Sequence, residues 1–291
     1  MLPDEIRTAL EIYWEENSLS TTVDHIQSIG GGSINHAYKV TTSSGSYFLK
    51  YNEAQAHPNM FSSEYKGLKV LADTKTIRIP EALYYYEGEE YSCILMEYIL
   101  ETNPSNYFWK SFAQNLANLH RYSADSFGLD FSNYMGSLPQ SNRQHTTFID
   151  FFIEERLQPQ IILARDNGYL HSAHIRKAEK LYQELSSIIP EEKQALVHGD
   201  LWSGNFMCDE KGEPLIMDPA IYYGHREVDI AMTTMFGGFS QEFFQYYQQN
   251  FPMEQAWEQR LPIYNLYPIL IHINLFGKSY LSGFERVLKR F

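Results

Sequence analysis

The strongest constraint on the fold is a change of sequence pattern near residue 100. Before this point, short runs rich in aromatic and β-branched residues alternate with glycine-containing turns, which is typical of antiparallel strands. The five strand candidates are HIQSIG (25–30), AYKVTT (37–42), SYFLKY (46–51), IPEALYYYEG (79–88) and YSCILMEYIL (91–100). Beyond Asn103 and Pro104, apolar residues recur at helical spacing instead. Because 291 residues suffice for two cores, we expect an α+β chain with an N-terminal lobe, residues 1–99, and a mostly helical C-terminal lobe, residues 100–291.

Helices are predicted in both lobes from the spacing of apolar residues. An amphipathic helix over residues 3–17 is indicated by Ile6, Leu10, Ile12 and Tyr13, which recur at roughly helical spacing. A helix after the third strand is expected to bury the face formed by Phe61, Tyr65, Leu68 and Ala72. Ser62 or Ser63 can cap the start of the second helix. The C-terminal lobe is expected to contain helices over 108–122, 148–168 and 178–190, a polar loop, GSLPQSNRQH, over 136–145, and aromatic-rich helices from Gln241 to Phe291 that break at Pro252, Pro262 and Pro268.

Charge and cysteine content exclude several classes of function. A formal net charge of -13 argues against a surface for nucleic acid or anionic lipid, because such surfaces need clustered Lys and Arg. The acidic balance serves solubility, or it attracts a cationic substrate. No apolar run is long enough to span a bilayer and the first residues are acidic, so we expect a cytoplasmic protein without a membrane partner. Cys93 and Cys208 lack metal or redox spacing, and we expect both to be packing residues.

The segment HGDLWSGN (198–205) has residue types suited to phosphoryl transfer. It follows the apolar run ALV (195–197), and a second apolar run, PLIMD, ends on Asp218. Phosphoryl transfer needs a carboxylate near the attacking hydroxyl and oxygen ligands for a magnesium ion on the nucleotide. Asp200, Asn205 and Asp218 supply these groups if the two runs are adjacent strands. The alternative interpretation is a polar turn between strands.

Two upstream features suit a nucleotide. The glycine-rich turn GGGSIN (30–35) does not fit GxGxxG, but Gly31, Gly32 and Ser33 offer backbone amides to phosphates; a plain glycine-rich hairpin is the alternative. Lys50 closes the third strand, and Glu64 lies on the first turn of the following helix. An ion pair between them would hold Lys50 against the α- and β-phosphates, whereas the alternative is a solvated surface pair.

Further residues are expected to complete the nucleotide and loop contacts. The backbone of Glu97, Tyr98 and Ile99 can bind the adenine edge beside Met96, which is also compatible with an ordinary core strand. Asp229 either accepts hydrogen bonds from the backbone of the 198–205 loop or caps a helix. His198 is expected to orient the loop through its side chain.

The spacing of Asp200 and Asn205 resembles the catalytic loop of the protein-kinase-like fold, in which the motif is His-Arg-Asp with an Asn five residues later. Gly199 in place of the Arg resembles the small-molecule branch of that fold. More specifically, most of the chain resembles the fructosamine kinases, or ketosamine-3-kinases. The similar segments are GGGSINHAYKV, the FLK strand, FSSEYKGLKVL, GSLPQSN, FFIEERLQPQI, HGDLWSGNF, MDPAIYYGHREVDIAM and FGGF. Trp202, Asp218-Pro-Ala and GHREVD are the features that aminoglycoside phosphotransferases and choline kinases usually lack.

This resemblance implies a bilobal kinase-like fold and transfer of the ATP γ-phosphate to the 3-hydroxyl of a ketosamine, followed by deglycation. The implied roles are Asp200 as proton acceptor, Asn205 and Asp218 as Mg²⁺ ligands, Lys50 with Glu64 on the phosphates, Glu97, Tyr98 and Ile99 at adenine, and Trp202 stacked on the sugar. The substrate would be a fructosyl, ribulosyl or erythrulosyl adduct of a free or protein-bound amine, with a monomer as the simplest assembly. The alternatives are a kinase of aminoglycosides, choline or sugars, and a nucleotide-binding module without catalysis.

Overall fold

The computed structural model describes residues 2–30 and 34–291, and these residues form two compact units. Unit 1 contains the described residues up to Phe108 together with Met207–Asp218, and unit 2 contains Trp109–Phe206 and Pro219–Phe291. The predicted α+β class is confirmed, because unit 1 is built on a five-stranded antiparallel sheet and unit 2 is mostly helical. The assignment of nucleotide binding to residues 1–99 and of catalysis to residues 100–291 stays a prediction.

The sheet of unit 1 has the strand order β1-β2-β3-β5-β4. Its elements are α1 (Asp4–Glu16), β1 (Val23–Ser28), β2 (His36–Thr42), β3 (Gly45–Glu53), α2 (Met60–Thr74), β4 (Ala82–Glu87) and β5 (Tyr91–Glu97). All five predicted strands and both predicted helices are therefore present.

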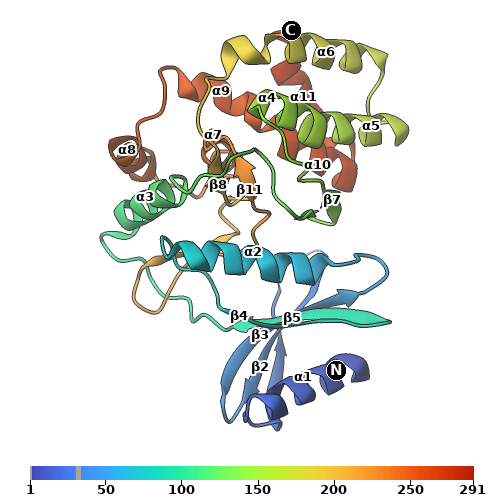
Figure 1. The fold of residues 1–291 in the computed structure, drawn as a ribbon, viewed down its shortest axis with the longest axis vertical. Coiled ribbons are helices and arrows are strands. Elements are labelled where there is room, and N and C mark those ends of the chain that lie inside the picture. Colours follow the sequence, from blue (N-terminus) through green and yellow to red (C-terminus); the bar gives the residue numbers. More distant parts are fainter. Residues whose placement is uncertain (1, 31–33) are drawn as a thin grey trace. The chain divides into compact units, whose positions relative to one another are not determined.

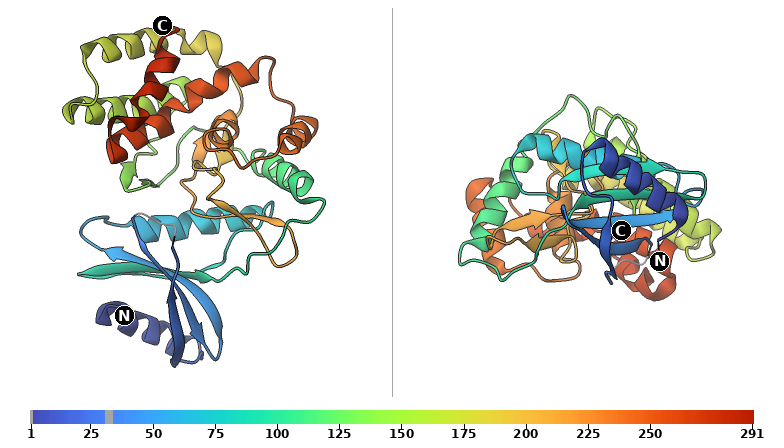
Figure 2. Two further views of the ribbon diagram at one scale, coloured as in Figure 1. Left: turned by 180° about the vertical axis from the view of Figure 1, so that it is seen from behind. Right: turned by 90° about the horizontal axis from the view of Figure 1, so that it is seen from below.

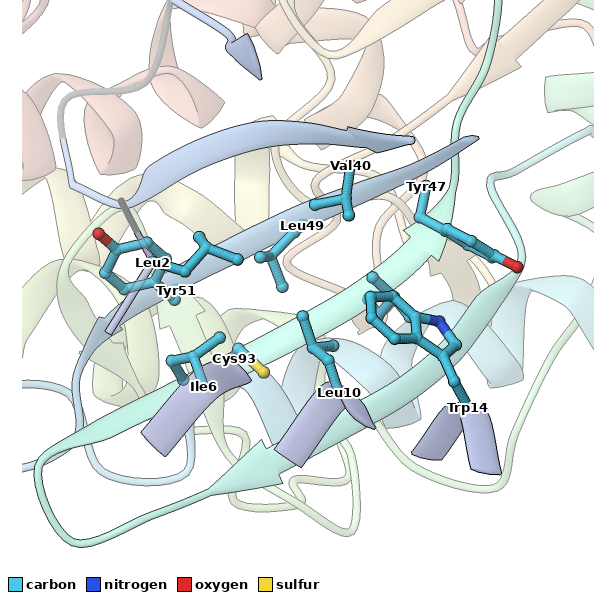
Figure 3. Close-up of a cluster of buried hydrophobic side chains, with 10 residues drawn as sticks. Leu2, Ile6, Leu10, Trp14, Val40, Tyr47, Leu49, Tyr51 and Cys93 are labelled. Carbon is cyan, nitrogen blue, oxygen red and sulfur yellow. The ribbon is translucent and has the colours of Figure 1, made fainter. Parts of the chain in front are cut away.

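Helices α1 and α2 lie on opposite faces of this sheet (Figures 1 and 2). Successive side chains of a strand point to opposite faces, and β3 follows this rule: Leu49 and Tyr51 pack in the cluster formed with α1, whereas Phe48 packs toward α2. Figure 3 shows the α1 side, where Trp14 and Leu10 meet the strands. Lys50 lies two residues after Phe48 in the same strand, so its side chain points to the same face, toward α2.

Helix α2 differs from its predicted form at both ends. It begins at Met60 after the N-cap residue Asn59, so the prediction that Ser62 or Ser63 is the cap was wrong. The Asn59 side chain makes no capping bond, and the Ser62 amide in the first turn donates to the Glu87 carboxylate at 3.0 Å. Both serine hydroxyls donate instead to carbonyls three residues earlier, a local bond open to serines inside a helix. This start places Glu64 in the second turn. Near the other end Ala72 is exposed, and Leu71 takes the predicted buried position.

The segment Met207–Asp218 packs within unit 1 because several hydrogen bonds hold it there. It contains most of strand β9 (Phe206–Cys208) and all of β10 (Pro214–Ile216), which pair with each other. The Thr102 amide donates to the Cys208 carbonyl at 3.1 Å, and the Ile216 amide donates to the Arg78 carbonyl at 3.0 Å. Asp218 follows β10 directly, so unit 1 includes this carboxylate.

Unit 2 consists of helices and two short strand pairs, β6 with β7 and β8 with β11. Its elements are α3 (Phe108–Leu119), whose first residue belongs to unit 1, β6 (Asn133–Met135), β7 (Leu138–Gln140), α4 (Phe148–Phe151), the π-helix η1 (Phe152–Leu157), α5 (Gln158–Asp166), α6 (Ser172–Ile188), β8 (Ala195–Val197), β11 (Tyr222–Gly224), α7 (Glu227–Thr233), α8 (Gln241–Asn250), α9 (Trp257–Tyr264), α10 (Leu266–Phe276), the 3-10 helix η2 (Lys278–Tyr280) and α11 (Leu281–Leu288). Among the residues with described positions, none belongs to a helix with the length and apolar character needed to cross a bilayer.

Three features of unit 2 depart from the sequence patterns. The predicted polar loop 136–145 contains strand β7, which forms a hairpin with β6, and the helix predicted over 148–168 contains the π-helix η1. Pro252 does lie between two helices, as predicted. The break predicted at Pro262 was wrong, since Pro262 lies inside α9, and Pro268 lies in the first turn of α10. The carbonyl four residues before Pro262 is that of Glu258, an exposed residue, so water can replace the missing helical bond.

Candidate active site

A buried ion cluster surrounds Lys50 in unit 1. Its Nζ atom lies 2.6 Å from Oε1 of Glu64 and 2.8 Å from Oδ1 of Asp218. The side chains of Lys50 and Glu64 are only 7% and 11% exposed, whereas that of Asp218 is 47% exposed. The predicted Lys50–Glu64 ion pair is confirmed, and the contact of Lys50 with Asp218 adds a second carboxylate that the sequence did not predict.

The carboxylates determine the protonation of Lys50. Burial alone lowers the pKa of Lys50, but the charges of Asp218 and Glu64 outweigh this effect and raise the pKa above its ordinary value. Burial raises the pKa of the Glu64 carboxyl, and the Lys50 ammonium offsets part of that rise. Lys50 therefore carries a positive charge near neutral pH.

Asp218 has a backbone conformation that is unusual for its residue type. Its φ angle is +54°, in the left-handed region that non-glycine residues rarely occupy. Such conformations persist where the surrounding structure holds them, and they are common at functional sites. Because one carboxylate oxygen contacts Lys50 while the side chain remains half-exposed, Asp218 can accept a further ligand, such as a hard cation.

The strand end expected to bind adenine has a second role in the structure. Glu97 is the last residue of β5, and its carboxylate accepts a bond from Arg78 at 2.8 Å. Arg78 also binds Asp209 at 2.5 Å and Glu210 at 2.8 Å. The Arg78 side chain thus ties the end of β5 to the turn that precedes β10, and sequence patterns gave no sign of it.

The other residues predicted to bind the nucleotide fall into two groups. One group lies near the end of β5, and the other lies outside the described part of the chain. Met96 and Ile99 are buried, and the ring of Tyr98 lies 4.2 Å from Nζ of Lys39. Gly31, Gly32 and Ser33, the residues expected over the phosphates, lie outside the described residues.

In unit 2, the loop after β8 holds Asp200 and Asn205 together. The Nδ2 atom of Asn205 donates to both the carbonyl oxygen and the Oδ2 atom of Asp200, each at 2.9 Å. The loop amide of Asp200 donates to Nδ1 of His198 at 3.3 Å, which agrees with the predicted orienting role of His198. The carboxylate of Asp200 is therefore fixed in direction by its own loop.

Gly199 explains why this loop carries no arginine before its Asp. The φ angle of Gly199 is +83°, which favours glycine, and a Cβ atom there would overlap the carbonyl of Ala220. The Ala220 amide donates to the His198 carbonyl at 2.9 Å. The backbone after Asp218-Pro219 thus packs directly on the loop that carries Asp200.

The buried carboxylate of Asp229 anchors the backbone of the 198–205 loop. Its carboxylate accepts bonds from the amides of His198 at 2.7 Å and Gly199 at 2.9 Å, so the predicted backbone contact is confirmed. Asp229 lies in the first turn of α7 and the N-cap residue of that helix is Arg226, so the capping alternative is wrong. Nε2 of His120 lies 3.1 Å from Asp229, and Nδ1 of His120 lies 2.7 Å from the Tyr247 hydroxyl.

The buried carboxylate of Asp229 is ionised more readily than an ordinary one. Burial raises its pKa, but the bonds from His120 and the loop amides outweigh burial and leave the pKa below its ordinary value. Sequence analysis missed His120 and Tyr247. A lone His at the end of a helix and a Tyr in an aromatic-rich segment carry no pattern that singles them out.

Trp202 is half-buried and has packing partners within the unit. Its ring lies against Gly204, where a Cβ atom would overlap the indole, and it meets the ring of Phe236 edge-on at 5.5 Å between centroids. Trp202 therefore contributes to the packing of the loop. The half-buried ring still leaves surface for a ligand.

The chain matches known proteins over most of its length. A family model described as Fructosamine kinase matches residues 7–291. A probable ketoamine kinase of Enterococcus faecium is 40% identical over 270 residues, covering 90% of this chain and 93% of that protein. A chloroplastic protein-ribulosamine 3-kinase of Arabidopsis thaliana is 38% identical over 271 residues, covering 91% and 81%. Among solved structures, a candidate fructosamine-3-kinase of Haemophilus somnus has a TM-score of 0.86 and 26% identity, covering 96% and 95%. This chain belongs to the fructosamine kinase family.

Proposed function

We propose that this chain transfers the γ-phosphate of ATP to the 3-hydroxyl of a ketosamine. The observation that carries the proposal is the fixed Asp200 carboxylate in the loop of a chain from the fructosamine kinase family. A carboxylate whose direction is fixed by Asn205, and whose loop is fixed by Asp229, suits a reaction that depends on positioning more than on a strong base.

In the proposed reaction, the 3-hydroxyl oxygen attacks the γ-phosphorus of ATP, and the bond from this phosphorus to the β,γ-bridging oxygen breaks. Asp200 accepts the hydroxyl proton as the new phosphorus–oxygen bond forms. The products are a ketosamine 3-phosphate and ADP. Loss of a proton from C1 of the product then gives an enaminol that expels phosphate from C3, and water hydrolyses the remaining carbon–nitrogen link to release the amine, which is deglycation.

The nucleotide contacts follow from the ion cluster of unit 1. Lys50 would exchange its contact with Asp218 for the α- and β-phosphates while Glu64 keeps it in place. The backbone of Glu97, Tyr98 and Ile99 would bind adenine, and the amides of Gly31, Gly32 and Ser33 would cover the phosphates.

The residue types of Asn205 and Asp218 also suit a magnesium ion. Asn205 and Asp218 would offer side-chain oxygens, which Mg²⁺ prefers, and Asp218 is exposed enough to accept this ligand. When bound, the ion would neutralise charge on the β- and γ-phosphates. Asn205 already directs its amide nitrogen to Asp200, so the amide oxygen is the atom that this proposal assigns to the metal.

An acceptor panel tests the proposal directly. The enzyme is incubated with ATP, Mg²⁺ and ribulosyl-, erythrulosyl- or fructosyl-lysine, and with an aminoglycoside, choline and free ribulose as controls. We expect the mass of one phosphoryl group to be added to the ketosamines alone. Phosphorylation of a control acceptor with no turnover of any ketosamine would overturn the proposal.

The sugar-stacking role of Trp202 has its own test. Trp202→Phe keeps an aromatic face, whereas Trp202→Ala removes it, and aromatic stacking adds up to about 1.5 kcal/mol beyond area burial. We expect kcat/KM for the ketosamine to fall roughly tenfold in Trp202→Ala and much less in Trp202→Phe. An unchanged kcat/KM in Trp202→Ala would exclude this role.

A further inference from the structure

A buried polar network lies beneath the catalytic loop of unit 2. It joins the β6–β7 hairpin to the chain segment that follows Asp218-Pro219. The Nδ2 atom of Asn133 donates to the Ile221 carbonyl at 2.9 Å, and the Nε2 atom of Gln140 donates to the Ala220 carbonyl at 3.0 Å. Gln140 also donates to Oδ1 of Asn133 at 2.7 Å and accepts from the Tyr267 hydroxyl at 2.8 Å.

A buried arginine supports this network from the π-helix η1. Arg156 is fully buried, and its guanidinium donates to the Ser141 carbonyl at 2.5 Å and to Oδ1 of Asn142 at 2.6 Å. The same guanidinium lies 4.1 Å from the centroid of the Tyr222 ring. Nδ2 of Asn142 in turn donates to Oδ1 of Asn133 at 3.1 Å. The positive charge is thus held by aromatic rings and neutral oxygens, which orients the amide side chains.

The network reaches the catalytic loop through Ala220. Gln140 binds the carbonyl of Ala220, and the amide of the same residue donates to the His198 carbonyl. The Ala220 carbonyl also packs against Gly199 so closely that no Cβ atom fits there. Gln140 is 1% exposed, so solvent cannot replace its bonds. A shift of Gln140 would therefore move the backbone on which the residues next to Asp200 rest.

We infer that Gln140 is a positioning residue for phosphoryl transfer, and that it sets the Asp200 loop through the backbone of Ala220. This inference rests on the proposed function for its kinetic part. Asn133, Asn142, Arg156 and Tyr267 hold Gln140 in the orientation that binds Ala220. Small displacements of a reacting group are costly in rate, which makes this network a determinant of kcat although Gln140 touches no substrate.

The test compares two identical substitutions at buried glutamines of unit 2. Gln140→Met removes the bonds to Ala220, Asn133 and Tyr267 while keeping the side-chain length. Gln160→Met is the matched control, since Gln160 is 6% exposed and its side-chain oxygen accepts a bond from Asn274 at 2.8 Å, in the packing of α5 against α10. Thermal unfolding of both variants shows whether their stabilities are comparable.

Two readouts separate positioning from a general loss of stability. In Gln140→Met we expect kcat to fall about 10- to 100-fold at an unchanged KM for ATP. Hydrogen exchange measured by mass spectrometry should speed up roughly tenfold in peptides that contain His198, Gly199 and Ala220. Gln160→Met should leave both quantities at the parent level. If Gln140→Met folds poorly, Tyr267→Phe removes only the hydroxyl bond to Gln140 and should shift both readouts in the same direction by a smaller amount.

Each outcome decides one point. Equal kcat values in Gln140→Met and Gln160→Met overturn the inference, as does a lower kcat without faster exchange at Ala220 and the loop. If the parent enzyme phosphorylates no ketosamine but exchange rises only in Gln140→Met, the proposed function fails while the anchoring of the loop by Gln140 stands.

Discussion

The two units hold Asp218 and Asp200, the carboxylates of the proposed site, in different ways. In unit 1, Asp218 is held by a charge contact with Lys50, and its side chain is half-exposed. In unit 2, the Asp200 loop is held by hydrogen bonds from its backbone amides to Asp229, which is fully buried. A charge contact with a half-exposed carboxylate can be exchanged for contacts with a phosphate, whereas bonds to a buried carboxylate cannot be exchanged with solvent or ligand. The first arrangement suits ligand binding, and the second suits a fixed catalytic framework.

The largest effect on activity is expected from a change at Asp200, the carboxylate carried by the hydrogen-bonded loop of unit 2. Asp200→Asn should lower kcat about 10³-fold, because an amide cannot accept the hydroxyl proton, while the loop keeps its bond from Asn205. Steady-state kinetics measure the loss, and calorimetric titration with ADP serves as the control, since nucleotide affinity should not change. A variant as active as the parent would show that Asp200 is not the proton acceptor.

Lys50→Met removes the charge contacts of Lys50 with Asp218 and Glu64 in unit 1. Without its ammonium, kcat/KM for ATP should fall about 10²-fold. At pH 7 the free energy of unfolding should drop by about 3 kcal/mol, because the buried Glu64 carboxylate loses its partner. Lys110→Met, at an exposed position, is the control and should change neither quantity.

The stability loss in Lys50→Met should depend on pH. Burial raises the pKa of Glu64 in the folded state, so the folded chain takes up a proton more readily than the unfolded chain, and lower pH favours folding. The difference from the parent in urea unfolding should therefore shrink between pH 7 and pH 5. A constant difference would mean that Glu64 carries no unpaired charge in the variant.

A smaller effect on kcat is expected when the backbone of the Asp200 loop is changed at Gly199. Gly199→Ala and Gly168→Ala both place Ala at a positive φ, +83° and +72°, which costs about 1–2 kcal/mol of stability. Only the Cβ at residue 199 would meet other atoms, those of Ala220, whereas the space at Gly168 is open. We expect a roughly tenfold lower kcat in Gly199→Ala alone. Equal kcat values in the two variants would contradict the close contact with Ala220.

The smallest effect is expected on the pH dependence of stability, which Asp229 contributes at low pH. Because the pKa of Asp229 is lowered in the folded state, its contribution to stability is complete above the unfolded value of 3.8 and is lost as the pH falls through the folded value. Below pH 4, Asp229→Asn should reduce the slope of the free energy of unfolding against pH by up to about 1 kcal/mol per pH unit. Urea unfolding at several pH values measures this slope, and the exposed Asp73→Asn should leave it unchanged. Identical slopes in parent and Asp229→Asn would rule out the ionised anchor.

The sequence alone determined the features that depend on short stretches of chain. Strand and helix periods identified the sheet of unit 1 and most helices of unit 2, because burial of one face repeats along an element. Asp200 and Asn205 were recognisable because they lie in one loop, five residues apart, where the chemistry requires these residue types. Pro262 and the start of α2 misled the prediction. Solvent can replace the bond lost at Pro262, and the Glu87 carboxylate from β4 accepts from the Ser62 amide at the start of α2.

Only the tertiary structure decided which side chains meet across the chain. Asp218 contacts Lys50 across 168 positions of sequence, His120 meets Tyr247 across 127, and Gln140 binds the Ala220 carbonyl across 80. A local pattern records that a residue is buried, but it does not record its partner. Partners are fixed by how distant elements pack, and for this reason the charge contact of Asp218, the contacts of His120 with Asp229 and Tyr247, and the Gln140 network emerged only from the folded chain.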